Sequence, residues 1–259
     1  SSYASIKSCV IANSQVSGWF PIGRSCRQGD PLSSYIFLIC AEILSIKMRN
    51  NVDIKGVQVQ DIDILISQFA DDTSLLLDGS EVSFESAITE LKTFETHSGL
   101  KINYEKTAAV WIGSSKGSLV RFRPDLAIIW NPSTFRILGV TSSVNLDELP
   151  RLNFTGKIEQ MKKIMSSWKN RDLTPLGRII VLKSLVVSVA THLFLCIPGI
   201  DNNTVKEINS LFFSFVWNGK RDKVKRTTMC QPYVNGGLRM IDVQKFISSL
   251  KITWMRKIF

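Results

Sequence analysis

The spacing of apolar residues changes along the chain, and this change constrains the fold more than any other feature. In roughly the first 140 residues, short apolar runs typical of strands alternate with stretches of helical spacing. From Asn153 onward the spacing is helical alone, with Phe154, Ile158 and Met161 starting one stripe. The sequence therefore predicts a mixed helix-and-strand region followed by a mainly helical one, with a boundary near Leu149-Pro150.

Net charge divides the chain in a similar way. The 259 residues are 44% hydrophobic and 21% charged, so the chain can bury a core and is not a disordered tail. Residues 1–113 carry 9 basic and 13 acidic side chains, whereas residues 114–259 carry 23 basic and 9 acidic ones. The second region favours a partner with a negative backbone, such as a nucleic acid. Basic surfaces also serve solubility, so charge alone leaves both interpretations open.

Several absences narrow the class of protein. The most apolar run, Ser184 to Ile197, has 14 residues without a formal charge, which is too short for a bilayer span and predicts a buried helix. We therefore expect no membrane partner. The five cysteines are odd in number and form no C-x-x-C pair, which argues against a disulfide framework or a zinc knuckle. Neither end carries a typical start or stop signal, so we expect a piece of a longer protein.

The first region has a readable order of elements. A helix is expected over Tyr35–Asn51, with Ile36, Ile39, Ile43 and Ile46 as its repeating apolar face. The other expected elements are a strand at Gly56–Val59, a helix over Ser80–Ser98 that ends at Gly99, and single strands at Thr107–Ile112 and Arg136–Val140.

Two adjacent carboxylates lie between the apolar runs Ile64–Phe69 and Thr73–Leu77, which predict a tight β-hairpin. Asp71 and Asp72 would occupy its tip. Neighbouring like charges repel each other unless a cation lies there, and hard divalent ions prefer oxygen ligands. The pair therefore predicts a metal site, although aspartates are also ordinary turn residues.

A second motif, GRSCRQGDPLSSYIF, leads into the first expected helix. Gln28 offers a donor and an acceptor on one side chain, and Gly29 lets the backbone approach a ligand closely. Pro31 restricts Asp30 to an extended conformation. The motif suits a ligand-binding loop, and it equally suits a capped loop-to-helix junction that needs no ligand.

Together these motifs resemble the reverse transcriptases of non-LTR (LINE-type) retrotransposons. RQGDPLSS is similar to their motif B, with Ser33-Ser34 where the usual form ends in Ser-Pro, and FADD is similar to motif C. SGLKINYEKT (Ser98 to Thr107) resembles motif D, and FRILGV (Phe135 to Val140) resembles motif E, the primer grip. LTPLGRIIVLKSLVV and NGGLRMIDV resemble the thumb and the segment after it. Order and spacing agree over nearly the whole chain.

The resemblance implies an α+β fold, with a reverse-transcriptase palm followed by a mainly helical thumb. The palm has a small antiparallel sheet with helices on one face. Residues 1–149 would form a partial palm with motifs B, C, D and E, and residues 150–259 the basic helical thumb and the start of the following segment. The fingers and motif A would be missing. By family analogy the protein is intracellular and nuclear.

The activity implied by the resemblance is that of an RNA-directed DNA polymerase, a nucleotidyltransferase. It would use two Mg²⁺ ions to join dNTPs to a primer 3′-hydroxyl. Its partners would be an RNA template, a DNA primer or product duplex, and dNTPs, and its oligomeric state is not implied. Asp71 and Asp72 would be the catalytic metal ligands, and Lys106 would protonate or neutralise the pyrophosphate. Lys106 also suits a solvated lysine at a strand entrance.

The remaining residues implied by the resemblance bind substrate or primer. Gln28, Gly29, Phe69 and Ala70 would shape the nucleotide pocket and the hairpin turn. The primer and duplex contacts would be Leu138 and Gly139 in motif E and the thumb residues Lys157, Lys162, Lys163, Lys169, Arg171 and Arg178, with Lys220 to Arg226 as a second patch. Each cation alone also suits a solvated surface, and an apolar residue followed by glycine suits a strand bulge.

One family residue has no counterpart in this sequence. The motif A aspartate lies upstream of motif B, and the 29 residues before Asp30 contain no Asp or Glu. We therefore expect this chain alone to be catalytically incomplete. Two other functions stay open: a non-catalytic nucleic-acid-binding remnant of a retroelement, and a group II intron-type maturase.

Overall fold

The computed structural model describes residues 6–23 and 29–258, and side chains as far as Thr253. The chain divides into two compact units, Ser1–Trp130 and Asn131–Phe259. We describe each unit by itself. This division falls before the boundary expected near Leu149-Pro150, because the hairpin that follows Asn131 packs against the first helix of unit 2. The division into palm and thumb stays a prediction.

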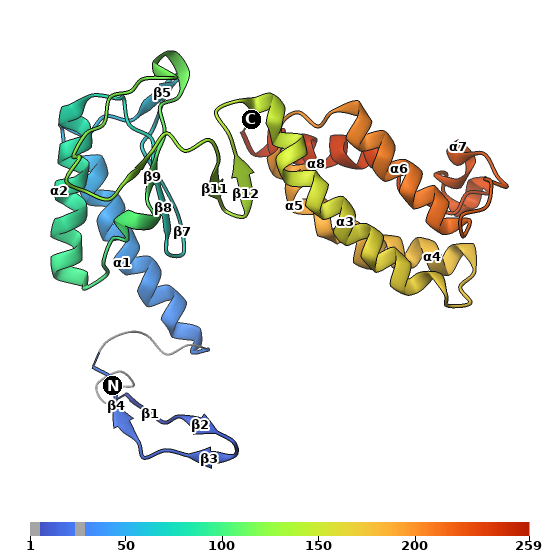
Figure 1. The fold of residues 1–259 in the computed structure, drawn as a ribbon, viewed down its shortest axis with the longest axis horizontal. Coiled ribbons are helices and arrows are strands. Elements are labelled where there is room, and N and C mark those ends of the chain that lie inside the picture. Colours follow the sequence, from blue (N-terminus) through green and yellow to red (C-terminus); the bar gives the residue numbers. More distant parts are fainter. Residues whose placement is uncertain (1–5, 24–28, 259) are drawn as a thin grey trace. The chain divides into compact units, whose positions relative to one another are not determined.

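Unit 1 combines two long helices with short strand pairs (Figure 1). The pairs β1–β4, β2–β3, β5–β6 and β7–β8 are antiparallel, and β9–β10 is parallel. Its elements are β1 (Lys7–Ser8), β2 (Ile11–Ala12), β3 (Gln15–Val16), β4 (Phe20–Pro21), α1 (Pro31–Asn50), β5 (Val57–Val59), β6 (Ile62–Ile64), β7 (Ile66–Phe69), β8 (Asp72–Leu75), α2 (Glu81–Ser98), η1 (Tyr104–Lys106), β9 (Ala108–Ala109), η2 (Gly113–Ser115) and β10 (Ile129–Trp130).

Capping residues set the ends of both helices of unit 1. Helix α1 begins earlier than expected because the side chain of Asp30 accepts a hydrogen bond from the backbone N–H of Leu32 at 2.9 Å. Helix α2 has Ser80 as its N-cap and ends at Gly99, whose φ of 72° is left-handed. The start and stop predicted for α2 are confirmed.

The core of unit 1 lies between α1, α2 and the β7–β8 hairpin, and α1 turns a different face to it than expected. The buried residues of α1 are Leu44, Ser45 and Met48, whereas Ile39 and Ile43 of the expected face are exposed. Helix α1 is apolar on several sides, so spacing alone did not select the buried one. By length and composition α1 could also cross a membrane, and 17% of the tested window is buried. A single such helix is weak evidence, because core helices and signal sequences pass the same test, and we infer no span from it.

Unit 2 is mainly helical and begins with a β-hairpin (Figure 1). Its elements are β11 (Phe135–Ile137), β12 (Val140–Ser142), η3 (Leu146–Glu148), α3 (Leu149–Lys169), α4 (Pro175–Val181), the π-helical turn η4 (Leu182–Val186), α5 (Ser188–Cys196), α6 (Asn202–Val216), α7 (Arg226–Met229), η5 (Tyr233–Asn235) and α8 (Val243–Ile258).

The core of unit 2 is built as the helical spacing predicted. Phe154, Ile158, Met161 and Met165 of α3 are buried in one cluster with residues of α4, α5, α6 and α8. The run Ser184 to Ile197 buries one side in this cluster, while Ser184, Leu185, Ser188, His192 and Cys196 are exposed. It is also not one straight helix, since the axis bends by 55° between residues 175–186 and α5. The mixed helices and small antiparallel sheets agree with the expected α+β class.

Two expected strands have a different form. The segment Arg136–Val140 is not a single strand: β11 and β12 form a hairpin in which Ile137 pairs with Val140. Residues Leu138 and Gly139 make its turn, so they are not a strand bulge. The strand expected over Thr107–Ile112 is reduced to β9, which pairs in parallel with β10.

Candidate active site and nucleic-acid interface

The acidic hairpin β7–β8 presents its two carboxylates at an exposed tip. Phe69 pairs with Asp72, and the two-residue turn between them is Ala70-Asp71. Of the two turn residues only Ala70 has a positive φ, 51°, as at the first central position of a type II′ turn. All four side chains are exposed, so the tip is open to a ligand.

Strand alternation separates the two faces of this hairpin. Ile66 and Leu75 pack against the core of unit 1, and Gln68 lies on the same face as Ile66. Phe69 and Asp72 therefore lie on the opposite face, away from α1. The hairpin thus turns its apolar face inward and carries one of its carboxylates on the outer face.

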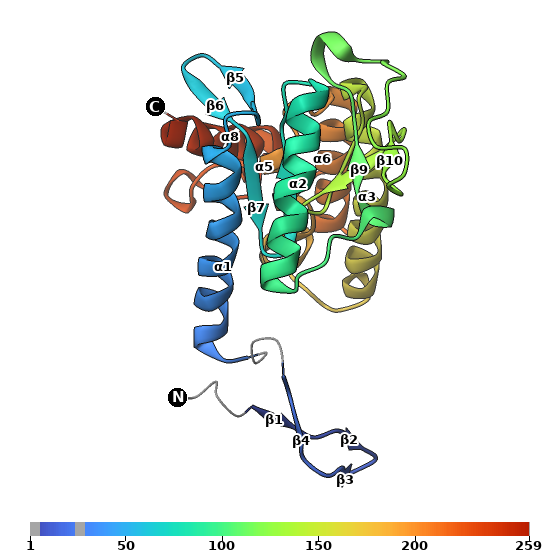
Figure 2. The ribbon, with the colours of Figure 1, turned by 90° about the vertical axis from the view of Figure 1, so that its left-hand side faces the viewer.

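A partly buried polar contact attaches the hairpin to α1. The Ser45 hydroxyl donates a hydrogen bond of 2.5 Å to the side-chain carbonyl of Gln68, and Ser45 is only 3% exposed. Helix α1 and strand β7 run in opposite directions, so the hairpin tip points toward the N-terminal end of α1 (Figures 1 and 2). At a rise of about 1.5 Å per helical residue, Asp30 lies about 22 Å from Ser45 along α1. At a rise of about 3.3 Å per strand residue, Asp71 lies about 10 Å from Gln68 toward the same end of α1.

The motif B residues lie at that same end of unit 1 where the structure describes them. Gly29 has a φ of 87° and no atom near the position of an added Cβ, so the backbone surface there is open. Gln28 lies outside the described residues. The N-cap bond of Asp30 satisfies the capped-junction interpretation, and the open Gly29 surface leaves the ligand-binding interpretation possible.

The two carboxylates are free to take a cation. Neither Asp71 nor Asp72 forms an ion pair with any described residue. Mg²⁺ is usually held by one or two carboxylates together with water and substrate phosphates, so this donor set fits the ion in part. Across the residues that the structure describes, no three His, Cys, Asp or Glu side chains gather into a metal-binding group. A further ligand must come from elsewhere.

Lys106 ends the 3-10 turn η1, just before strand β9. Its backbone N–H donates to the side chain of Asn103 at 3.1 Å, and its side chain is exposed. Among the described contacts none joins Lys106 to the hairpin tip. Its exposure is consistent with both interpretations of Lys106, a solvated lysine and a side chain that contacts the pyrophosphate of a bound substrate.

The motif E turn belongs to unit 2 and is held by a histidine. Leu138 and Gly139 have φ values of 47° and 82°, the two positive values of a type I′ turn. Nε2 of His192, in α5, lies 2.9 Å from the Leu138 carbonyl oxygen, and it donates this hydrogen bond when the proton is on Nε2. A leucine in left-handed backbone is strained, which marks this turn as a functional candidate.

The thumb cations do not form one continuous stripe along α3. Lys162 pairs with Glu159 at 2.7 Å and with Glu207 at 3.5 Å, so its charge is largely compensated. Lys157 is half-buried, and Lys163, Lys169 and Arg171 are exposed.

Arg178 corrects the expectation that it binds nucleic acid. Its side chain is 5% exposed, and its guanidinium donates to three backbone carbonyl oxygens inside unit 2. A buried group with these partners cannot reach a phosphate, so Arg178 is a structural residue.

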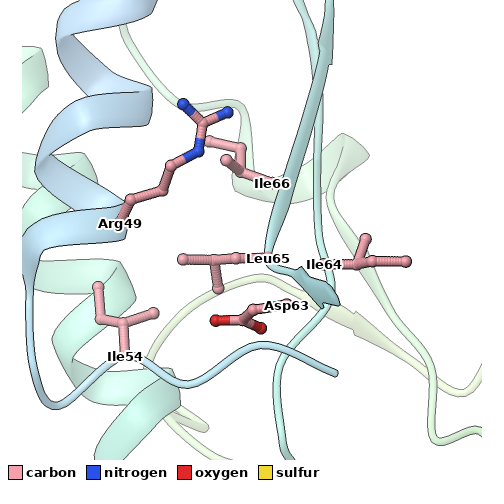
Figure 3. Close-up of a pocket in the computed structure, with 6 residues that line it drawn as sticks. All are labelled: Arg49, Ile54, Asp63, Ile64, Leu65 and Ile66. Carbon is pink, nitrogen blue, oxygen red and sulfur yellow. The ribbon is translucent and has the colours of Figure 1, made fainter. Parts of the chain in front are cut away.

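A cavity of about 340 Å³ lies away from these sites, at the end of β7 opposite the hairpin tip. Figure 3 shows Arg49 and Asp63 on opposite sides of Leu65, so the two charged groups do not meet across it. The cavity is therefore not part of the candidate active site.

The sequence profile described as "Reverse transcriptase (RNA-dependent DNA polymerase)" matches residues 1–142, more than half of the chain. The chain belongs to the reverse transcriptase family. This match covers the acidic hairpin, the motif B segment and the motif E turn, so the open pair Asp71 and Asp72 is part of a reverse-transcriptase domain.

Two curated proteins are similar to this reverse transcriptase. The Transposon TX1 uncharacterized 149 kDa protein of Xenopus laevis is 25% identical over 260 residues, which cover 98% of the chain and 19% of the relative. The Uncharacterized mitochondrial protein AtMg01250 of Arabidopsis thaliana is 39% identical over 69 residues, 25% of the chain and 57% of the relative. The chain thus spans about a fifth of the transposon protein. The expected resemblance to retrotransposon reverse transcriptases is confirmed.

Sequence reasoning missed two residues that shape the sites of this reverse transcriptase. Ser45 lies among apolar neighbours in α1, and its hydroxyl group was the only sequence signal for a polar contact there. His192 lies in the apolar run Ser184 to Ile197, where it was the one residue with two ring nitrogens to satisfy. Ser45 bonds to the hairpin that carries Asp71 and Asp72, and His192 bonds to the Leu138-Gly139 turn. The sequence did identify the residues at the tips of both hairpins.

Proposed function

We propose that the chain carries part of the nucleotidyl-transfer site of an RNA-directed DNA polymerase from a non-LTR retrotransposon. The observation that carries this proposal is the exposed, uncompensated pair Asp71 and Asp72 at the tip of a hairpin fixed to α1. Two Mg²⁺ ions, when bound, would bring the primer 3′-hydroxyl and the α-phosphate together and neutralise developing charge. Asp71 would be the main ligand and Asp72 its companion.

The other residues bind and orient substrate. The open backbone at Gly29, with Gln28, would adjoin the incoming nucleotide, and Phe69 and Ala70 would fix the direction of the two carboxylates. Lys106 would neutralise the departing pyrophosphate. The Leu138-Gly139 turn would contact the primer backbone, with His192 as the residue that holds its position. An RNA template, a DNA primer and dNTPs are the partners that family membership supports.

A metal-binding experiment tests the acidic tip directly. Mn²⁺ serves as a paramagnetic substitute for Mg²⁺, and its free concentration can be followed by electron paramagnetic resonance. We expect the wild-type chain to bind Mn²⁺ at the hairpin, and Asp71→Asn to weaken this binding by roughly tenfold or more, because a ligand is removed.

Unit 1 supplies a matched control for that variant. The neighbouring hairpin β5–β6 has the same kind of turn, with Gln60 at a φ of 55° followed by Asp61, but its next residue is Ile62 rather than a second aspartate. Asp61→Asn should leave Mn²⁺ binding unchanged. Equal effects of the two variants, or no binding by the wild type, would overturn the proposed metal site.

Activity of the chain alone is a separate part of the proposal. Primer extension by the purified chain with Mg²⁺, an RNA template and dNTPs should be negligible, because the 29 residues before Asp30 supply no third carboxylate. Robust extension by the chain would show that the catalytic site is complete without that carboxylate.

A further inference from the structure

A cysteine and a histidine lie one turn apart on the exposed side of α5. Sγ of Cys196 lies 3.7 Å from Nδ1 of His192 and 3.8 Å from its Nε2, and both side chains are exposed. Among the cysteines that the structure describes, Cys196 is the one exposed thiol, because Cys9, Cys40 and Cys230 are half-buried. The pair therefore brings a sulfur donor and a nitrogen donor together at the surface of unit 2.

The β11–β12 hairpin determines which nitrogen of His192 is free. Nε2 of His192 lies 2.9 Å from the Leu138 carbonyl oxygen. A carbonyl oxygen can only accept a hydrogen bond, so the proton of this contact lies on Nε2. In the neutral imidazole Nδ1 then keeps an unshared electron pair, and the Cys196 thiol lies within reach of it.

This orientation is typical of a histidine that binds a metal ion. Histidine ligands usually donate their second ring N–H to a backbone carbonyl or a carboxylate, which fixes the tautomer and turns the ring toward the ion. His192 makes such a contact with the Leu138 carbonyl. The contact is an observation independent of the thiol, and it points to a ligand at Nδ1.

The separation of the two donors also suits a thiophilic ion. Zn²⁺ binds cysteine sulfur at about 2.3 Å and histidine nitrogen at about 2.0–2.1 Å, so a tetrahedral angle places the two donors about 3.6 Å apart. The distance from Sγ to Nδ1 is 3.7 Å. Since Sγ is almost equally far from both ring nitrogens, it must turn about the Cα–Cβ bond toward the Nδ1 edge to share an ion. Cys196 is exposed, so no packed core has to rearrange for this rotation.

The pair would supply two of the four ligands of a tetrahedral ion. Across the described part of the chain, no third His, Cys, Asp or Glu gathers with these two residues. Water would complete the coordination, as it does at one position of catalytic zinc sites. We therefore expect a weaker site than a structural zinc site, with an ion that exchanges with solution.

We propose that Cys196 and His192 form a two-residue site for a thiophilic divalent cation such as Zn²⁺ or Cd²⁺. The site goes beyond the proposed function, since its sulfur and nitrogen donors select a softer ion than the carboxylates of Asp71 and Asp72 do. Burial raises the pKa of the Cys196 thiol, so the thiol is protonated at neutral pH before an ion binds. Binding forms one sulfur–metal and one nitrogen–metal bond and releases the thiol proton to solvent.

An ion at this site would strengthen the attachment of the Leu138-Gly139 turn to α5. Coordination at Nδ1 leaves the Nε2 proton in place, and the ion withdraws electron density from the ring. The Nε2–H group then becomes a stronger donor to the Leu138 carbonyl. The site thus links the concentration of a metal ion to the firmness of a turn with strained backbone.

Cadmium titration of the full 259-residue chain in its reduced form tests the site, because a cadmium–thiolate bond absorbs in the ultraviolet. We expect Cys196→Ser to remove the tightest-binding component of this absorption. His192→Gln should weaken the binding of Cd²⁺ by roughly tenfold or more, because a ligand is lost. Glutamine can still donate to the Leu138 carbonyl, so this variant would rescue a purely structural role of His192.

Two matched controls carry the same substitutions elsewhere in the chain. Cys230→Ser removes a half-buried thiol of the same unit. His97→Gln removes an exposed histidine whose Nδ1 lies 2.7 Å from the Thr93 carbonyl oxygen, so its ring also adjoins a carbonyl. Each control should change the Cd²⁺ affinity by less than about threefold.

Hydrogen exchange supplies a second readout, at the hairpin itself. Saturating Cd²⁺ or Zn²⁺ should slow the exchange of the β11–β12 amides in the wild type and leave it unchanged in His192→Gln. Unchanged exchange in the wild type would show that the ion does not act on the turn.

Three outcomes would overturn the site. One is survival of the tightest-binding component in Cys196→Ser, and another is an unchanged Cd²⁺ affinity in His192→Gln, which would leave a thiol acting alone. The third is one ion bound by two chains. Failure here is distinguishable from failure of the acidic tip, because Asp71→Asn should weaken Mn²⁺ binding and leave the cadmium–thiolate absorption unchanged.

Discussion

The hydroxyl of Ser45 donates a 2.5 Å hydrogen bond to Oε1 of Gln68, and both side chains lie on the inward sides of their elements. Alternation along β7 would favour an apolar residue at the position of Gln68, because its neighbours on that face, Ile66 and Leu75, pack in the core. A specific polar pair at this place favours one register of the hairpin on α1. The pair thereby favours one position of the acidic tip along α1.

The first prediction tests this register. Ser45→Ala leaves Gln68 without its partner, and we expect the free energy of unfolding of unit 1 to fall by about 1–2 kcal/mol. Replacing both residues, as Ser45→Ala with Gln68→Met, should restore much of the loss, since no polar group is then left unsatisfied. Hydrogen exchange of the β7 and β8 amides measures the effect locally, and unchanged exchange in Ser45→Ala would contradict the assigned role.

The second prediction concerns Arg178. Arg178→Met removes the donors to Leu173, Phe215 and Lys169 and should destabilise unit 2 by about 3 kcal/mol or more, as measured by urea denaturation. Arg178→Lys should recover only part of this, because lysine lacks the planar fork of donors. Arg151→Met, on the exposed surface of α3, is the control and should change stability by about 0.5 kcal/mol or less.

The third prediction concerns the pH dependence of the α6 cap. The Thr204 side chain and backbone N–H donate to Asp201 at 2.6 and 2.8 Å, and these bonds hold the pKa of the Asp201 carboxyl below its ordinary value of 3.8. A lowered folded-state pKa means that the stabilisation is complete above 3.8 and is lost as the pH falls through the folded value.

Two variants separate the charge of Asp201 from its capping bond. Asp201→Ala should cost about 1 kcal/mol at neutral pH. Asp201→Asn keeps a cap but does not titrate, so its stability difference from the wild type should narrow in acid. A difference that stays constant from neutral pH down to about pH 3 would contradict the assignment.

The fourth prediction separates stability from binding at the motif E turn. Asn tolerates left-handed backbone better than Leu, so Leu138→Asn should raise the free energy of unfolding by about 0.5–1 kcal/mol. If Leu138 contacts the primer, the same variant should bind an RNA–DNA hybrid more weakly. Gly139→Ala, at a φ of 82°, should instead destabilise by about 1 kcal/mol. Tighter hybrid binding by Leu138→Asn would exclude the primer contact.

Local signals predicted much of this fold. The hairpin around Ala70-Asp71 and the start and stop of α2 at Ser80 and Gly99 follow from residue types that determine backbone geometry nearby. Family resemblance led to Asp71 and Asp72, because the motif order was specific. Their participation in catalysis stays a prediction.

Contacts between segments far apart in the chain could not be predicted from the sequence. Arg178 looked like any surface arginine, since its partners are backbone carbonyls brought near by two other helices. Similarly, an apolar helix such as α1 does not reveal which face will be covered, so Ser45 could not be placed. Spacing encodes periodicity along one element, whereas these contacts depend on how elements pack.

Helix α3 sets the distance between two sites proposed to contact nucleic acid, the β11–β12 turn and Lys169. The β11–β12 hairpin is attached near its start, where Asn153 bonds to the backbone of Thr141, and the exposed Lys169 is its last residue. Sixteen residues of α-helix span about 24 Å. A duplex that lay along α3 and touched both places would need about seven base-pair steps, at a rise of about 3.4 Å per step.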